Sequence, residues 1–171
     1  MSVHEHKKNK GPVNCMIITV SDTRTRETDK SGNLMIQLLE ENGHHIIARE
    51  IVTDDKQGIE ELINKGAESP DIDVILTNGG TGISYRDVTY ETVKHLLDKE
   101  LSGFGELFRM LSYKEDIGSA AIMSRAIAGI YNHTAVFSTP GSSGAVKLAM
   151  NRLIIPELSH VVNEIKKDFN N

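Results

Sequence analysis

Residues 74–82 read VILTNGGTG, a short apolar run that ends in a glycine-rich loop, and this stretch decides the fold. Turn-forming residues bound the apolar run, which is typical of a buried β-strand. Three glycines in four positions let the backbone approach a ligand closely and point its N–H groups inward. Such a loop suits a phosphate, and a tight glycine turn without any ligand fits the same residues equally well.

Two strands and two helices are predicted before this stretch. Residues 13–20 and 46–52 are nearly continuous apolar runs, and they predict buried strands. Apolar residues repeat at i, i+4 across residues 34–39, which predicts a helix that ends at residues 42–43, Asn-Gly. Apolar positions in residues 59–63 predict a second helix.

The order β-α-β-α-β predicts an α/β fold, with a parallel sheet covered by helices on both faces. Ligands of such sheets bind outside the carboxyl ends of the strands. We therefore expect three polar segments to meet at one edge of the sheet, namely residues 21–26, 53–56 and 78–87.

The second half of the chain is richer in helix. Residues 93–97 and 104–111 carry helical apolar spacing, while residues 126–131 and 134–137 predict a hairpin that turns at residues 132–133.

The chain closes with a long amphipathic segment across residues 146–165, which Pro156 is expected to kink or break. One apolar face in the middle of the chain fits either the core or a contact between subunits. This face comprises Phe104, Leu107, Phe108 and Leu111.

Length and composition indicate one ordinary globular domain over residues 11–171, preceded by a loose polar tail at residues 1–10. A net charge of −5 argues against nonspecific nucleic-acid binding, and no apolar stretch approaches the ~20 residues of a membrane helix. The start lacks the apolar core of a secretory signal, so the expected location is the cytoplasm. Cys15 alone forms no disulfide or cysteine zinc site, and it is expected to be buried.

Carboxylates follow two of the predicted loops. Asp54-Asp55 follows the second strand, and Asp87 lies in the sequence Arg86-Asp87-Val88-Thr89, where Thr89 is a plausible helix N-cap. Each acid has a plain alternative role, as a polar loop residue or a cap. Beside a phosphate loop, however, two carboxylates are the minimum set for Mg²⁺-assisted phosphoryl or nucleotidyl transfer.

A second loop of the same kind, Pro140-Gly141-Ser142-Ser143-Gly144, precedes the last long segment. It is either another anion site or a helix N-cap made by Ser142 or Ser143. Two such loops in one small chain suggest a ligand with two anionic parts.

Several common motifs are absent from the sequence. It contains no GxxxxGK[ST], GxGxxG, GxSxG or HExxH, which argues against a P-loop, a dinucleotide fingerprint, a serine hydrolase elbow and a zinc protease. The histidines lack metal-ligand spacing, and His4 and His6 in the tail are expected to be solvated.

Taken together, the motifs resemble the MoaB/MogA family of molybdenum cofactor biosynthesis, most closely its MoaB branch. The resemblance runs from about Asn14 to Ser159, and Tyr90 stands where many members have proline. It rests on Ser21-Asp22-Thr23, Asp54-Asp55, Gly79-Gly80-Thr81-Gly82, Arg86-Asp87-Val88-Thr89, Gly103-Phe104-Gly105-Glu106, Ser124-Arg125 and Pro140-Gly141-Ser142.

The resemblance implies a Rossmann-like three-layer α/β/α sandwich, with a mostly parallel sheet and an antiparallel edge strand. It implies a homo-oligomer, either a trimer or a hexamer, with other proteins of the pathway as possible partners. It also implies an activity: transfer of AMP from Mg-ATP to the terminal phosphate of molybdopterin, which releases pyrophosphate.

The same resemblance assigns roles to residues. Asp54 and Asp87 match the acids tied to Mg²⁺ and adenylyl transfer. The matches for substrate binding are Gly79, Gly80, Thr81 and Gly82 in the phosphate loop, Ser21 and Asp22 after the first strand, Pro140, Gly141 and Ser142 on the pterin and nucleotide side, and Ser124 in the same cleft.

Two other functions remain open at this point. One is a noncatalytic protein that binds molybdopterin or assists assembly in the same pathway, since a fold does not fix a function. The other is a nucleotide hydrolase similar to the related competence-damage domain.

Overall fold

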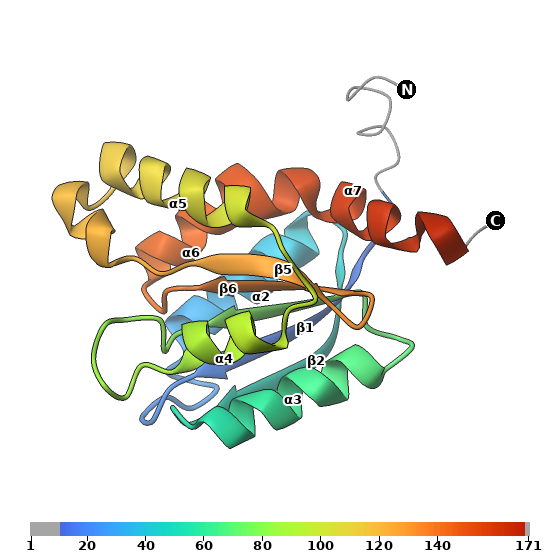
Figure 1. The fold of residues 1–171 in the computed structure, drawn as a ribbon, viewed down its shortest axis with the longest axis horizontal. Helices are drawn as coiled ribbons and strands as arrows, with labels where there is room; N and C mark the ends of the chain where they lie inside the picture. Colours follow the sequence, from blue (N-terminus) through green and yellow to red (C-terminus); the bar gives the residue numbers. More distant parts are fainter. Residues whose placement is uncertain (1–10, 170–171) are drawn as a thin grey trace.

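The computed structural model describes residues 11–169, which form a mixed sheet with helices packed on both faces (Figure 1). The strand order is β2-β1-β3-β6-β5-β4; the first four strands are parallel, and the β6–β5 and β5–β4 pairs are antiparallel. The predicted three-layer fold with an antiparallel edge is therefore confirmed. The strands are β1 (Asn14–Val20), β2 (His45–Val52), β3 (Val74–Asn78), β4 (Lys99–Glu100), β5 (Ile127–Tyr131) and β6 (Thr134–Thr139).

Helices on the two faces enclose two separate apolar cores. Alternate residues of β1 point to opposite faces, so Cys15 and Ile17 pack in one core while Met16 and Ile18 pack in the other. Helices α2, α5, α6 and α7 cover the first face, and α3 and α4 cover the second (Figure 1). The helices are α2 (Lys30–Glu41), α3 (Lys56–Glu68), α4 (Thr89–Leu96), α5 (Ser102–Glu115), α6 (Ser143–Ala149) and α7 (Ile155–Lys166).

The predicted hairpin is confirmed as β5 and β6, which pair antiparallel around a two-residue turn. Asn132 and His133 in this turn have φ values of 45° and 62°. Positive φ at both central residues is what a type I′ turn requires. The two-residue strand β4 was not predicted, because so short a segment carries no periodicity.

The predicted break at Pro156 is also confirmed. A π-helical turn, Met150–Ile154, separates α6 from α7, and Pro156 lies in the first turn of α7. Proline has no N–H group to donate within a continuous helix, so the hydrogen-bonding pattern changes just before it.

Most of the apolar face on α5 belongs to the core. Phe104, Phe108 and Leu111 are buried, whereas Leu107 is 47% exposed. Cys15 is buried as expected, and burial raises the pKa of its thiol to about 12. None of the helices in residues 11–169 is long and apolar enough to cross a membrane. The predicted tail, residues 1–10 with His4 and His6, lies outside the described residues, as do residues 170–171.

Candidate functional site

A cleft of about 580 Å³ opens at the carboxyl ends of the parallel strands. It lies between β1 and β3, where the strand order reverses, which is the usual ligand position in such sheets. The loops after β1, β3 and β6 line the cleft. The predicted site residues in its wall are Ser21, Gly79, Gly80, Thr81, Gly82, Asp87, Ser124, Pro140, Gly141 and Ser142.

Two predicted acids, Asp22 and Asp54, lie beside this cleft rather than in its wall. The backbone N–H of Asp54 donates to Asp22 Oδ1 at 3.0 Å, which joins the loops after β1 and β2. A Cβ at Gly80 would lie 2.9 Å from Asp54 Oδ1, so this carboxylate packs against the glycine loop. The three polar segments therefore meet at one edge, as predicted.

The glycine loop packs so closely against its neighbours that two of its positions leave no room for a side chain. Gly79 and Gly80 have φ values of 96° and 68°, which strongly favour glycine. A Cβ at Gly79 would lie 2.2 Å from the carbonyl oxygen of Val20, and a Cβ at Gly80 would lie 2.1 Å from Thr89 Oγ1. The loop is thereby held against the end of β1 and the start of α4.

The backbone donors of this loop are the most distinctive feature of the cleft. Within residues 11–169, the consecutive N–H groups of Gly80, Thr81, Gly82 and Ile83 donate to no protein acceptor. Unpaired backbone N–H groups are normally satisfied by water or ligand. Successive free N–H groups form a concave site for anions, so this arrangement suits a phosphate better than an ordinary glycine turn.

Thr89 is not the N-cap that the sequence predicts. Val88 occupies the cap position, and no side chain caps α4. The Thr89 N–H donates to the Gly80 carbonyl at 2.9 Å, while its hydroxyl is buried and has no hydrogen-bond partner among the described residues. Thr89 therefore packs against the glycine loop instead of capping the helix.

Asp87 both faces the cleft and holds its own loop. Its Oδ2 accepts hydrogen bonds from the Ser84 N–H at 3.0 Å and from the Ser84 hydroxyl at 2.6 Å. Asp87 is therefore not the helix cap that the plain alternative expected, since its carboxylate accepts from Ser84 earlier in the loop and no side chain of the described residues caps α4. A carboxylate held in this way is also fixed in position toward a ligand.

Asp54 is held differently, because its carboxylate accepts no hydrogen bond from residues 11–169. Partial burial raises the pKa of Asp54, and the nearby charges of Asp22 and Asp87 raise it further, while Arg86 opposes them. Arg86 forms an ion pair with Asp22. The environment of Asp54 therefore disfavours its negative charge unless a cation is added.

This donor set fits a magnesium ion that arrives with phosphates. Mg²⁺ commonly takes one or two carboxylates and completes its shell with water and substrate phosphates. Asp54 and Asp87 supply two such carboxylates beside the free N–H groups. In the described part of the chain, no three histidine, cysteine or acidic side chains are grouped to hold a metal by themselves.

Two loop residues cap helices in the structure, and of these only Ser142 was predicted to do so. Asp55 Oδ2 accepts from the Gly58 N–H at 2.8 Å, so the second acid of Asp54-Asp55 caps α3. Ser142 Oγ accepts from the Ala145 N–H at 3.2 Å and caps α6. Ser142 still lines the cleft next to Gly141, where a Cβ would lie 3.1 Å from the Gly79 Cα.

Sequence reasoning missed the polar floor of the cleft. Asn78 donates to the Thr19 hydroxyl at 3.1 Å and accepts from the Ser31 hydroxyl at 2.9 Å. Thr19 in turn donates to the buried Asp29 at 2.7 Å, and Arg49 pairs with Asp29 at 3.2 Å. These contacts join residues up to 59 positions apart, which no local motif reveals.

Other missed wall residues are Arg24, the one cationic side chain among the lining residues, and three from the segment after α5. These three are Ile117, Ala120 and Met123, which lie in or beside the 3₁₀ helix Gly118–Met123 and give the cleft an apolar side. Arg24 lies in the segment 21–26, which the sequence predicts to reach this edge of the sheet, so its place near the cleft could have been inferred.

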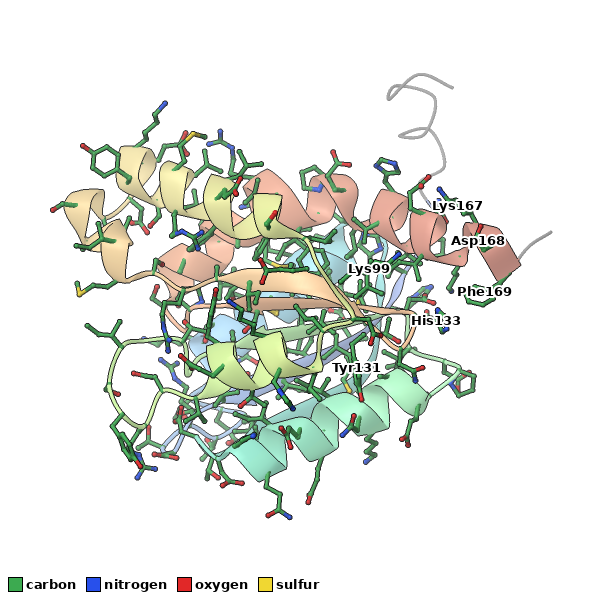
Figure 2. All side chains as sticks on the ribbon, in the orientation of Figure 1. Lys99, Tyr131, His133, Lys167, Asp168 and Phe169 are labelled. Atoms are coloured by element: carbon green, nitrogen blue, oxygen red, sulfur yellow. The ribbon has the colours of Figure 1, made fainter. Side chains whose placement is uncertain are left out.

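A second cavity of about 740 Å³ lies at the opposite end of the sheet. Figure 2 shows Lys99, His133, Lys167, Asp168 and Phe169 gathered there, beside the β5–β6 turn and the end of α7. The His133 and Phe169 rings meet edge to face with centroids 4.8 Å apart. No predicted site residue lies at this end.

Comparisons with known proteins agree with this geometry. Residues 16–160 match the family described as a probable molybdopterin binding domain. The chain is 66% identical over 169 residues to Molybdenum cofactor biosynthesis protein B of Bacillus subtilis, which covers 98% of this chain and 99% of that protein. It is 50% identical over 169 residues to the protein of the same description from Staphylococcus aureus, covering 98% and 100%.

Solved structures give the same result. A crystal structure of Molybdenum cofactor biosynthesis protein B superposes with a TM-score of 0.91 at 59% identity, covering 92% of this chain and 98% of that chain. The tungsten cofactor synthesizing protein MoaB from Pyrococcus furiosus superposes with a TM-score of 0.80 at 40% identity, covering 90% and 97%. The chain therefore belongs to the MoaB/MogA family of molybdenum cofactor biosynthesis proteins.

Proposed function

We propose that this protein transfers AMP from Mg-ATP to the terminal phosphate of molybdopterin. In this reaction a phosphate oxygen of molybdopterin attacks the α-phosphorus of ATP. One new P–O bond forms, the bond between the α-phosphorus and its bridging oxygen breaks, and pyrophosphate leaves with the bonding electrons. The observation that carries the proposal is the run of N–H groups from Gly80 to Ile83, which have no acceptor in the described part of the chain and lie beside the carboxylates of Asp54 and Asp87.

The two reacting groups are polyanions that repel each other, so the site must supply positive potential. The free N–H groups of the glycine loop provide fixed donors, and Arg24 adds a cationic side chain. Fixed donors of this kind stabilise developing negative charge without reorganising during the reaction. Held by Asp54 and Asp87, Mg²⁺ would screen the phosphate charge and help orient the attack.

The pterin phosphate has a second set of groups at the other side of the cleft. Gly141 and Ser142 follow β6 and line the cleft, and Gly141 packs against Gly79, so a ligand in the cleft can contact both loops. The apolar side chains of Ile117 and Met123 offer a surface for a flat ring. We assign the loop at residues 140–142, together with Ser124, to pterin binding.

The test is a product assay with purified protein, Mg-ATP and molybdopterin, read by mass spectrometry for adenylylated pterin and by pyrophosphate release. Product that disappears when EDTA is added supports the proposal. Pterin binding by calorimetry without any product would instead indicate a noncatalytic binding or assembly protein. Release of AMP from ATP in the absence of pterin would indicate a hydrolase.

We also propose that the protein is a homo-oligomer, as the family resemblance implies. Several large apolar side chains on α5 and the segment after it are exposed, among them Leu107 at 47% and Ile122 at 88%. Contiguous exposed apolar surface is typical of subunit contacts. Sedimentation at micromolar concentration should show a trimer or a hexamer, and a single species near 18.9 kDa would contradict this.

A further inference from the structure

The glycine loop is held from outside the cleft by one side chain, Arg125. Its Nε donates to the Thr81 carbonyl at 3.1 Å, and its Nη2 donates to the Gly82 carbonyl at 2.6 Å. Nη2 also lies 3.4 Å from the Asp87 carbonyl. One guanidinium therefore holds carbonyls of the glycine loop and of the loop that carries Asp87, although it is 44 residues from Thr81 in the chain.

Peptide geometry converts these carbonyl contacts into an orientation of N–H groups. In a planar trans peptide, the carbonyl and the following N–H point in opposite directions. Fixing the Thr81 and Gly82 carbonyls toward Arg125 therefore turns the N–H groups of Gly82 and Ile83 away from it. Arg125 is not part of the cleft wall, whereas Thr81 and Gly82 are, so the Gly82 N–H lies on the cleft side of the loop, and Ile83, which is not itself a lining residue, follows directly after it.

Arg125 is itself held on two further sides. Glu91 in α4 accepts from both Nη1 and Nη2, the latter at 3.2 Å. Partial burial raises the pKa of Glu91, but the hydrogen bonds from Arg125, a backbone hydrogen bond and the charge of Arg125 together outweigh it, and this pKa lies below its usual range. The guanidinium carbon also lies 5.1 Å from the centroid of the Tyr90 ring, within the range of a cation–π contact.

We propose that Arg125 is a positioning residue that presents the N–H groups of Gly82 and Ile83, and the carboxylate of Asp87, to bound phosphates. A guanidinium suits this task because it is planar, always charged and carries five donors in a fixed fork. Arg125 touches no substrate and acts through the loop. The proposal rests on the proposed phosphate-binding function of the cleft, and it adds the device that orders the phosphate site.

The test compares wild type with Arg125→Ala, Arg125→Lys and Glu91→Gln, and uses Arg152→Ala as a matched control. Arg152 also forms an ion pair with a glutamate, but its partner Glu115 is the last residue of α5 and does not belong to the glycine loop. The first readout is the NMR order parameters of residues 80–83 without ligand. The second is the affinity for inorganic pyrophosphate with Mg²⁺, by calorimetry, and the third is kcat and KM for ATP.

We expect Arg125→Ala to lower the order parameters from about 0.85 to below about 0.6 and to weaken pyrophosphate binding about 10- to 100-fold. Arg125→Lys should recover part of both, because an ammonium keeps the charge but reaches fewer carbonyls. For Glu91→Gln, we expect order parameters and a pyrophosphate affinity between those of wild type and Arg125→Ala. Arg152→Ala should have the wild-type values of both. If Arg125→Ala does not fold, the lysine and Glu91 variants still decide the question.

The outcomes separate this proposal from the proposed reaction. Unchanged order parameters and pyrophosphate affinity in Arg125→Ala, with only a lower Tm, would make Arg125 a purely structural residue and overturn the inference. A wild-type protein that forms no adenylylated pterin, while the variants lose loop order, would contradict the reaction and leave the role of Arg125 supported.

Discussion

The two ends of the sheet both carry an irregular turn and a cavity, but they differ in how their polar groups are used. At the β5–β6 turn, the Asn132 N–H donates to Asp98 at 2.8 Å and its side-chain amide donates to the Ala67 carbonyl at 3.2 Å. At the cleft, the four N–H groups from Gly80 to Ile83 donate to no acceptor among residues 11–169. The cleft is nevertheless the smaller of the two cavities, at about 580 Å³ against 740 Å³.

This difference teaches that unpaired backbone N–H groups, rather than cavity size, distinguish the proposed site from the other end of the sheet. At the other end, several polar side chains bond to one another. Lys167 forms an ion pair with Glu164 at 2.8 Å, and the Tyr131 hydroxyl donates to Asn64 at 2.5 Å. Successive N–H groups without a protein acceptor are available to bind an anion.

The largest effect is expected for Asp87→Asn. The asparagine keeps an acceptor oxygen for Ser84, so the loop should retain its shape while losing the negative charge. We expect the rate of product formation to fall about 100- to 1000-fold, by analogy with loss of one fixed electrostatic group from an active site. The same change at the other end, Asp98→Asn, should leave the rate unchanged; equal losses in both variants would remove the distinction between the ends.

Gly80→Ala should have the next largest effect. Its new Cβ would meet Thr89 Oγ1 and Asp54 Oδ1 at a positive φ, so we expect a loss of stability of about 1–3 kcal/mol. Mg-ATP affinity should fall at least about tenfold, because the N–H groups move. Gly43→Ala is the control: it also has a positive φ, but nothing lies within 4 Å of its Cβ, so only stability should change. Calorimetry and thermal unfolding measure both quantities.

Arg24→Ala is expected to weaken Mg-ATP binding about fivefold to tenfold, since one charge-assisted contact to phosphate is lost. Arg26→Ala removes a cation from the same loop but not from the cleft wall, and it should leave the affinity unchanged. The salt dependence of binding should decrease only in the Arg24 variant. Equal weakening by both variants would show that only the total charge of the loop matters.

The smallest expected change in this series is a gain in thermal stability from Asp54→Asn. The same variant should lose activity, because it removes a proposed Mg²⁺ ligand. Burial and the neighbouring acids raise the pKa of Asp54 above its ordinary value near 3.8, so its charge destabilises the native state. This cost is fully present above the raised pKa and disappears as the pH falls below about 3.8, where both states are protonated. We expect Tm at pH 7 to rise by about 1–3 °C, and the gain to vanish below a pH of about 3.8; a lower Tm at pH 7 would contradict this account of Asp54.

The sequence predicted the cleft because strand order and loop composition are local signals. The segments 21–26, 53–56 and 78–87 meet at one edge once the β-α-β-α-β order is recognised. The hairpin turn at Asn132 and His133 was likewise predictable, because asparagine and histidine adopt positive φ more often than most residues. The loop positions of Asp54-Asp55 and Asp87 indicated the acids, the resemblance assigned the metal role to Asp54 and Asp87, and the structure shows that Asp55 caps α3.

Features that depend on long-range contacts could not be predicted in this way. Arg125 reaches carbonyls 43 and 44 residues away, and a guanidinium in the sequence gives no sign of its partners. Thr89 has the residue type of an N-cap, yet tertiary packing against Gly80 takes precedence over that local preference. The 3₁₀ helix Gly118–Met123 brings apolar side chains to the cleft without any periodic pattern.

The measurement that tests the central claim most directly is a crystal structure with Mg²⁺ and the non-reacting analogue α,β-methylene-ATP. The account predicts phosphate oxygens within hydrogen-bonding distance of the N–H groups of Gly80–Ile83, with the metal bound by Asp54 and Asp87. A nucleotide in the cavity beside His133 and Phe169, or one whose phosphates lie away from the glycine loop, would contradict it.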